Sequence, residues 1–314
     1  SNREVRTSKI VAEQLRQLGI EVQTGIAHTG VVGILRGGKP GPTIALRSDM
    51  DALPVTEQGD LPFKSTATSE YRGEKVGVMH ACGHDGHMAI LLGAAKALAG
   101  MRNELPGTVM FIFQPAEEGA PDGERGGASL MLDEGLFAAN KPDAVFGLHL
   151  WSAMNTGAIG YREGSLMAAS DRFKLVVKGR QTHGSRPWGG VDPIVTASQI
   201  VMALQTIVSR QVNITEYPVV VSVGAIKGGI RTNIIPESVE MVGTFRTFDP
   251  AVREQVIESI KHISSQTAAA AGATTVFELG GDPNPVVVND PALTARAVAS
   301  LQRAAGGDTV KVMP

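Results

Sequence analysis

The spacing of apolar residues predicts alternating strands and helices in the first half of the chain. Residues 8–18 and 88–98 carry apolar side chains at helical intervals, and Gly19 marks the end of the first helix. Short apolar runs of strand length occupy residues 30–35, 43–47, 107–114 and 144–150. We expect a turn over residues 37–42, between the first two strands. Strands that alternate with helices are typical of an α/β fold.

The second half shows strict alternation of apolar and polar residues, which is typical of strands with one covered face. The first such strand is expected at residues 172–178. It is followed by a helix at 193–209, strands at 219–226 and 239–248, a helix at 250–271 and a strand at 274–279. The order β-α-β-β-α-β is the split βαβ pattern of a ferredoxin-like two-layer sandwich.

The last residues return to the pattern of the first half, with a helix expected at 290–305 and a strand at 310–313. The ferredoxin-like part is therefore an insertion. We expect one domain formed by residues 1–166 and 282–314, and an inserted α+β domain formed by residues 167–281.

Composition indicates a soluble globular protein: 43% of the 314 residues are hydrophobic and 19% are charged. The net charge of −2 predicts no nucleic-acid or anionic membrane partner, and no apolar run is long enough to be a credible membrane span. A single cysteine fits a reducing compartment, so we expect a cytoplasmic protein. The chain begins at Ser1-Asn2, which could be a cloning scar, and a leader could precede it.

The chain's only cysteine lies among histidines, in residues 79–87 (Met-His-Ala-Cys-Gly-His-Asp-Gly-His). Sulfur, imidazole and carboxylate groups this close together suit zinc or manganese. The alternative is a buried free cysteine beside surface histidines. Cys82 and His84, two residues apart in an expected extended segment, could share one side, and His80 could join them. His87 falls in the first turn of the next helix, where packing or a hydrogen bond is expected.

Other predicted strands also end in polar residues. Asp49 and Asp51 follow one strand and face the same way, as a site or as a turn that closes the strand. Glu117 and Glu118 follow another, and adjacent residues of an extended chain point in different directions, so we expect separate roles. His149 ends a fourth segment. Open α/β sheets bind ligands at the carboxyl ends of their strands, so we expect one site at one edge.

Two polar loops of the inserted domain carry further candidates, at residues 179–187 and 228–236. His183, Arg231 and Asn233 are donors that could hold an oxyanion or a substrate carboxylate. The alternative is that both segments are ordinary connecting loops.

Five segments together resemble the two-domain, metal-dependent aminoacylase and carboxypeptidase superfamily. They are residues 48–54 (Ser-Asp-Met-Asp-Ala-Leu-Pro), 79–87, 113–119 (Phe-Gln-Pro-Ala-Glu-Glu-Gly), 147–151 (Gly-Leu-His-Leu-Trp) and 231–236 (Arg-Thr-Asn-Ile-Ile-Pro). The likeness is greatest to the branch of hippurate hydrolases, N-acyl amino acid amidohydrolases and plant indole-acetyl amino acid hydrolases. It covers nearly the whole chain, in order.

The resemblance implies two divalent ions per subunit, zinc or manganese, with nickel and cobalt as alternatives. The implied ligands are Cys82, His84, Glu118 and His149, with Cys82 shared between the ions. Glu117 would be the catalytic general base, and Asp51 would support the metal site.

In the inserted domain, the resemblance places Arg231 and Asn233 near the substrate, while His183 would reach a neighbouring subunit's active site. This domain would then be a lid and dimerisation domain of a homodimer or homotetramer. The family supplies a last histidine ligand after a Gly-Ser-Glu-Asp-Phe segment, which would follow Pro314. We therefore expect a longer protein, and the metals would be partly held or absent without that ligand.

The implied activity is hydrolysis of the amide bond of small N-acyl amino acids by a metal-activated water. One alternative is a metallo-carboxypeptidase or dipeptidase on the same scaffold. The other is a non-catalytic binding protein, if the last ligand is absent.

Overall fold

The computed structural model describes residues 1–71, 73–121 and 123–313, which divide into two compact units, Ser1–Met154 and Asn155–Pro314. Each unit is a group of residues that mostly contact one another, which does not define where a domain begins or ends. The expected domain limits of 1–166, 167–281 and 282–314 therefore remain predictions. Each unit has a mixed α/β composition, which confirms the predicted class.

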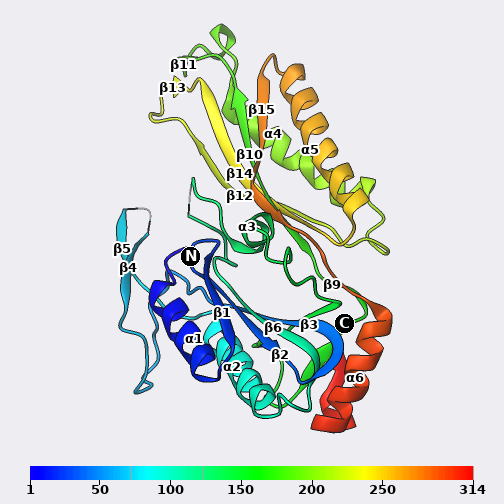
Figure 1. Cartoon of the computed structure of the whole chain (residues 1–314). Helices are drawn as coiled ribbons and strands as arrows, with labels where there is room; N and C mark the ends of the chain where they lie inside the picture. The colour runs from blue at the N-terminus through cyan, green and yellow to red at the C-terminus, as the bar shows by residue number, and fades with distance from the viewer. Residues whose placement is uncertain (72, 122, 314) are drawn as a thin grey trace. The chain divides into compact units, whose positions relative to one another are not determined.

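The first unit is built on a five-stranded sheet with the strand order β1-β2-β6-β3-β7 (Figure 1). Its elements are α1 (Val5–Gln17), β1 (Glu21–Ile26), β2 (Gly30–Arg36), β3 (Lys39–Asp49), β4 (Thr68–Tyr71), β5 (Glu74–Gly77), α2 (His84–Gly100), β6 (Pro106–Gln114), α3 (Gly127–Asp133) and β7 (Ala144–Gly147). Strand β2 is antiparallel to β1 and β6, whereas β3 is parallel to β6 and β7. The expected turn at 37–42 is shorter, because β3 already begins at Lys39.

Both faces of this sheet are covered, which explains why its central strands are almost continuously apolar. Successive side chains of β6 point to opposite faces: Phe111 and Phe113 pack with α1 and α2, whereas Met110 and Ile112 pack with Met131 of α3. Figure 1 shows α1 and α2 side by side below the sheet. The sheet is thereby fixed between two apolar layers.

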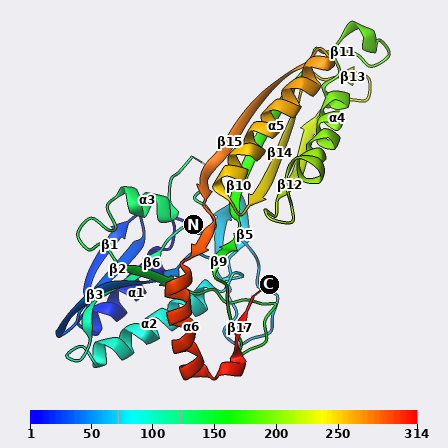
Figure 2. The ribbon, with the colours of Figure 1, turned by 90° about the vertical axis from the view of Figure 1, so that its right-hand side faces the viewer.

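The second unit contains a four-stranded antiparallel sheet of order β12-β14-β10-β15, with two long helices on one face (Figure 2). Its elements are β8 (Ile159–Tyr161), β9 (Gly164–Met167), β10 (Ala169–Lys178), β11 (Thr182–His183), η1 (Pro187–Gly189), α4 (Pro193–Thr206), η2 (Ile207–Gln211), β12 (Val220–Gly228), β13 (Ile234–Ile235), β14 (Ser238–Thr247), α5 (Pro250–Ala270), β15 (Thr274–Asn284), β16 (Val287–Asn289), α6 (Pro291–Ala305), η3 (Gly307–Thr309) and β17 (Val310–Val312). The order β10-α4-β12-β14-α5-β15 confirms the predicted split βαβ pattern.

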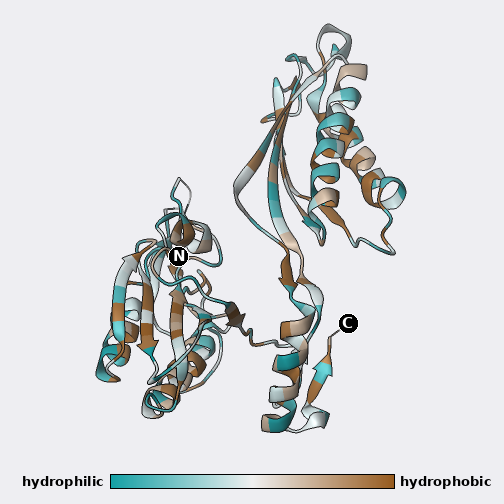
Figure 3. Cartoon of the chain, turned by 45° about the vertical axis from the view of Figure 1, so that its right-hand side comes forward, coloured by the Kyte–Doolittle hydropathy of each residue, from teal (hydrophilic) through white to brown (hydrophobic). Residues whose placement is uncertain are grey.

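The core of the second unit lies between its sheet and the helices α4 and α5. Leu175 of β10, Met241 of β14, Ile200 of α4 and Ile260 of α5 are fully buried there. Figure 3 shows both helices with mixed hydrophilic and hydrophobic colouring, as expected for helices with one buried side. The last elements pair within the same unit, β16 with β9 and β17 with β8.

Among the described residues, no helix is both long and apolar enough to span a bilayer.

Candidate metal centre

The carboxyl ends of three parallel strands meet at one edge of the first sheet. Asp49, the last residue of β3, lies opposite Gln114, the last residue of β6. Gly147, the last residue of β7, lies opposite Arg47 of β3, and His149 follows two residues later. The chain therefore delivers polar side chains from three strands to the same edge, as the sequence predicted.

Cys82 and His84 reach this edge from a helix start and not from a strand. The expected extended segment is wrong: Ala81 and Cys82 form a turn, and His84 is the first residue of α2. Gly83 between them has φ 87°, a left-handed conformation that favours glycine. The two side chains are brought together by this turn, and the predicted place of His87 in the first helical turn is confirmed.

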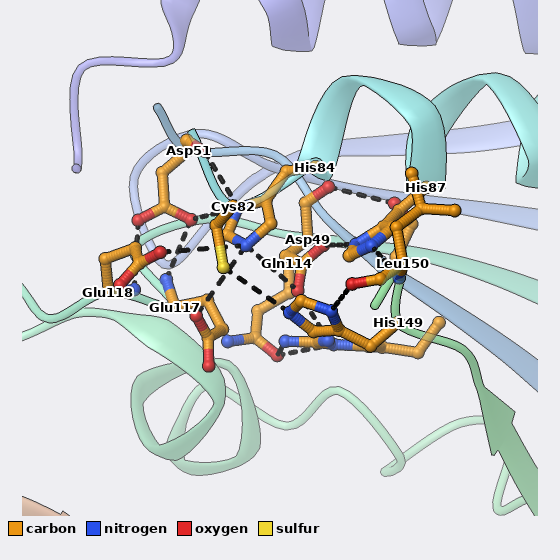
Figure 4. Close-up of polar contacts among 12 residues, drawn as sticks. Asp49, Asp51, Cys82, His84, His87, Gln114, Glu117, Glu118, His149 and Leu150 are labelled. Atoms are coloured by element: carbon orange, nitrogen blue, oxygen red, sulfur yellow. Dashed lines mark hydrogen bonds and ion pairs between the residues drawn. The ribbon is translucent and has the colours of Figure 1, made fainter. Parts of the chain in front are cut away.

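The loop after β6 turns sharply at Ala116, which has φ 49°. The next two backbone N–H groups donate to the carboxylate of Asp51: Glu117 N to Oδ1 at 3.0 Å and Glu118 N to Oδ2 at 3.1 Å. Because the chain is not extended here, the two glutamates do not point apart as expected. Glu117 Oε2 and Glu118 Oε1 lie 3.8 and 3.9 Å from the same atom, Nε2 of His84 (Figure 4).

Two histidines direct Nε2 into the site and use Nδ1 elsewhere. His84 Nδ1 donates to the carbonyl oxygen of Asp51 at 2.8 Å, and His149 Nδ1 donates to that of Leu150 at 2.6 Å. A carbonyl oxygen can only accept, so in the neutral form of each ring Nε2 carries the lone pair that a metal needs. Cys82 Sγ lies 3.4 Å from His149 Nε2.

His87 is close to the same histidines, but both of its ring nitrogens are occupied. Its Nε2 accepts from the N–H of Leu150 at 2.8 Å, so its Nδ1 must donate to Asp49 Oδ1 at 2.6 Å (Figure 4). Burial lowers the pKa of His87 and the Asp49 contact only partly offsets this, which fits a neutral ring. His87 therefore holds the segment that carries His149, and the expectation that it forms a nearby hydrogen bond is confirmed.

The charges around His84 favour a cation. His84 is buried, and carboxylates of Asp49, Asp51, Glu117 and Glu118 all lie within 4 Å of its ring nitrogens. Burial would lower the pKa of His84, but the hydrogen bond to Asp51 and the charges of Asp49, Asp51 and Glu117 raise it. A divalent ion would compensate this concentration of negative charge.

The same environment shifts the pKa values of Asp51 and Glu117 in opposite directions. Burial would raise the pKa of Asp51, but hydrogen bonds from His84, Ser1 and two backbone N–H groups lower it to about 2. Burial raises the pKa of Glu117, Arg47 opposes this, and the charges of Glu118, Asp49 and Asp51 add to the rise. Asp51 is thus held ionised, while Glu117 keeps a proton more readily.

The described residues fit a metal site. Nε2 of His84 and Oε1 of Glu118 are buried and have no hydrogen-bond partner among the described residues. Three groups of ligand atoms each lie within 4.8 Å of one another: Cys82 with His84 and His149, Asp49 with His84 and His87, and His84 with Glu117 and Glu118. Ligands of one tetrahedral ion, bound at about 2.0–2.3 Å, are roughly 3.3–3.8 Å apart. The group with His87 is excluded by its hydrogen bonds, so the other two remain.

A metal would also change the state of Cys82. Burial and the neighbouring Glu118 and Glu117 raise the pKa of this thiol to about 12, so a cation is needed to hold it as a thiolate.

The candidates of the second unit come together within that unit. His183 of β11 pairs with Ile234 of β13, and Gly184 N donates to the carbonyl oxygen of Asn233 at 2.8 Å. Arg231 and Asn233 lie in the loop that leads into β13, and Arg231 is exposed. His183 Nδ1 lies 2.7 Å from Ser185 Oγ. Their roles toward a substrate remain predictions.

Two residues that support the site, Arg47 and Ser1, were not predicted from the sequence. Arg47 donates to Gln114 Oε1 and to Asp49 Oδ2, which ties the ends of β3 and β6 together. The alternation Arg47-x-Asp49-x-Asp51, at the end of β3 and just past it, was the available signal. Ser1 Oγ donates to Asp51 Oδ2 at 2.7 Å, a contact that no local pattern indicates.

The comparisons with known proteins agree with this geometry. Residues 45–314 match the pattern of peptidase family M20/M25/M40. The chain belongs to this family. A peptidase family hydrolyses amide bonds, so the membership confirms both the resemblance and the expectation of a hydrolase.

Individual relatives cover most of the chain. Thermostable carboxypeptidase 2 of Saccharolobus solfataricus is 44% identical over 94% of this chain and 72% of its own length. N-acyl-L-amino acid amidohydrolase of Geobacillus stearothermophilus is 38% identical over 98% of this chain and 80% of its own length. The solved YXEP protein of Bacillus subtilis, described as a dinuclear metal binding peptidase of the M20 family, has a TM-score of 0.78 and 38% identity, covering 97% of this chain and 75% of that one.

Proposed function

We propose that the protein is a metal-dependent amidohydrolase that cleaves N-acyl amino acids. The observation that carries this proposal is the convergence of Glu117 and Glu118 on the free Nε2 of His84, in a cluster that also holds Cys82 and His149. The similarity to an N-acyl-L-amino acid amidohydrolase supports the substrate class.

Cys82, His84, Glu118 and His149 would hold two divalent ions, with Cys82 between them. The dinuclear description of the similar Bacillus subtilis structure supports the number of ions. When bound, such ions lower the pKa of water toward neutrality and stabilise negative charge on a carbonyl oxygen.

Glu117 would act as the general base. Its raised pKa and its exposed fraction of 34% suit a carboxylate that takes a proton from water and passes it to the leaving nitrogen. Asp51 would hold the backbone of Glu117 and Glu118 and the Nδ1 edge of His84, so its role is to position them. In the second unit, His183, Arg231 and Asn233 would bind the substrate, with oligomer formation through the same unit.

The test of the proposal is Glu117→Gln. We expect hydrolysis of an N-acyl amino acid to fall by at least about a hundredfold, because general acid–base catalysis contributes roughly a hundred- to ten-thousandfold. Metal content should be unchanged, since Glu117 is not among the proposed ligands. Steady-state kinetics and elemental analysis measure the two quantities. Full activity of this variant with normal metal content would contradict the assigned role.

A carboxypeptidase is the second candidate, because a relative of that name is 44% identical to this chain. Both reactions hydrolyse an amide bond next to a free carboxylate, so the same cluster serves either. A panel of acyl- and peptidyl-amino acids, assayed with added zinc or manganese, separates them: a preference for peptidyl substrates would favour the carboxypeptidase.

A further inference from the structure

We propose that Glu4 is a positioning residue for the Glu117–Glu118 loop, holding the backbone of Ala116 from the N-terminal end of α1. This rests on the proposed function, in which Glu117 is the general base. Glu4 belongs to none of the motifs that identify the site, and it is 112 residues away from Ala116 in the chain.

The side chain of Glu4 is directed away from its own helix. Glu4 is the N-cap residue of α1, yet it forms no side-chain cap hydrogen bond there. Residues at this position commonly accept a hydrogen bond from the first turn of their helix. Instead, Oε2 accepts from Thr29 Oγ1 at 2.6 Å and Oε1 accepts from the N–H of Ala116 at 3.3 Å. The residue itself is buried, and both carboxylate oxygens have a partner.

Ala116, whose N–H donates to Glu4, has an unusual backbone conformation. Ala116 has φ 49°, which an L side chain seldom adopts. It is also 3% exposed, so an N–H left without an acceptor there would be buried. The contact from Glu4 therefore stabilises a conformation that the alanine does not favour by itself.

The contact completes a row of three backbone donors. The N–H groups of Ala116, Glu117 and Glu118 are consecutive, and two buried carboxylates accept from all three: Glu4 from the first, Asp51 from the other two. The direction of the Glu117 and Glu118 side chains follows from this backbone. Asp51 also contacts His84, whereas the structure gives Glu4 no contact with a proposed metal ligand, so its loss should disturb the loop without removing a ligand.

The packing around Ala116 leaves the loop little freedom to adapt. A Cβ added at Gly126 would lie 3.1 Å from Ala116 Cβ, and one added at Gly127 would lie 3.0 Å from the Ala116 carbonyl oxygen. These glycines let the start of α3 pack closely against the loop. A side chain at position 4 that cannot accept a hydrogen bond therefore leaves a local defect that the neighbours cannot absorb.

The test compares Glu4→Met with Glu4→Gln in the metal-loaded protein. Methionine has a similar length but accepts no strong hydrogen bond, so we expect kcat to fall by about 10- to 100-fold, the range for residues that orient a catalytic group. KM and metal content should stay close to those of the parent. Glutamine can accept from Ala116 and donate to the Thr29 hydroxyl, and should retain most of kcat.

A second measurement does not depend on activity. In the metal-free protein, amide hydrogen exchange of residues 116–119 should be faster in Glu4→Met than in the parent and in Glu4→Gln. Replacing Ala116 by glycine in the Glu4→Met background should recover part of kcat, because glycine adopts positive φ without strain. Arg3→Ala, which removes an exposed ion pair with Glu124, is the matched control and should change neither quantity.

Should Glu4→Met fail to fold, Thr29→Val removes only the hydroxyl that donates to Glu4 and should shift exchange and kcat in the same direction by less. Parental kcat and parental exchange of the loop in Glu4→Met would overturn the proposal. So would a loss of kcat that only follows the unfolded fraction. If Glu117→Gln keeps its activity, the proposed function fails. The exchange measurement then still shows whether Glu4 holds the loop.

Discussion

The roles of individual residues in this site depend on which ring nitrogen of each histidine is free. His84 and His149 each use Nδ1 to contact a backbone carbonyl and keep Nε2 for a ligand. His87 uses both nitrogens, and its ring lies edge-on to that of His149 with centroids 4.6 Å apart. Three neighbouring histidines thus divide into two candidate ligands, the buried His84 and the half-buried His149, and one supporting residue, His87.

Cys82 is the residue whose replacement tests the ligand assignment. We expect Cys82→Ser to lower the metal content of the purified protein, because a hydroxyl is a much weaker ligand for zinc than a thiolate. Elemental analysis after dialysis against a metal buffer measures the effect. His183→Asn, in the second unit, is the control and should leave the content unchanged. An unchanged metal content in Cys82→Ser would remove Cys82 from the ligand set.

At the scale of elements, three helices of the second unit begin with the same dipeptide. Asp192, Asp249 and Asp290 are the N-cap residues of α4, α5 and α6, and in each case proline follows at the first helical position. Each aspartate accepts from one or two N–H groups of the first turn. Proline costs no hydrogen bond at that position, so Asp-Pro defines where each helix begins.

The cap of α5 can be tested without disturbing the core. Asp249 accepts from Ala251 and Val252, so Asp249→Ala should lower the free energy of unfolding by about 1 kcal/mol. Urea-induced unfolding measures this difference. Asp249→Asn retains an acceptor and should be close to the parent. Equal stabilities of the alanine and asparagine variants would show that the cap contributes nothing.

At the scale of the whole molecule, each unit has a core of its own, and the candidate ligands all belong to the first. Phe111 and Phe113 anchor one core of the first unit, while Leu175 and Phe245 belong to the core of the second. Metal binding is therefore expected to stabilise the folded state of the first unit.

Removal of metal by a chelator should consequently act on one unit. We expect faster amide hydrogen exchange in β3, β6 and the start of α2, because a ligand stabilises the state to which it binds. Exchange in β10 and β14 should stay as in the metal-loaded protein. Mass spectrometry of peptides from both units gives the comparison within one sample. Equal acceleration in both units would contradict the confinement of the site to the first.

Much of the fold followed from local pattern, and the failures have identifiable causes. The continuous apolar run of β6 and the Asp-Pro helix starts are visible in the sequence. Strand β1 was not predicted, because its side chains stay largely exposed and only its pairing with β2 makes it a strand. The turn at Cys82 was missed because it depends on the left-handed conformation of Gly83.

The sequence by itself determined which chemical groups this protein has and at which strand ends and helix starts they lie. That information is local, since side-chain periodicity and capping depend on neighbouring residues. Only the tertiary structure decided that His87 uses both ring nitrogens in hydrogen bonds, whereas Nε2 of His84 has no partner among the described residues. It also decided that Glu4 and Asp51 together accept from three successive N–H groups. The physical reason is that each of these contacts joins residues tens of positions apart, with Glu4 and Ala116 the most distant pair. Packing of the whole first unit brings them within hydrogen-bond distance.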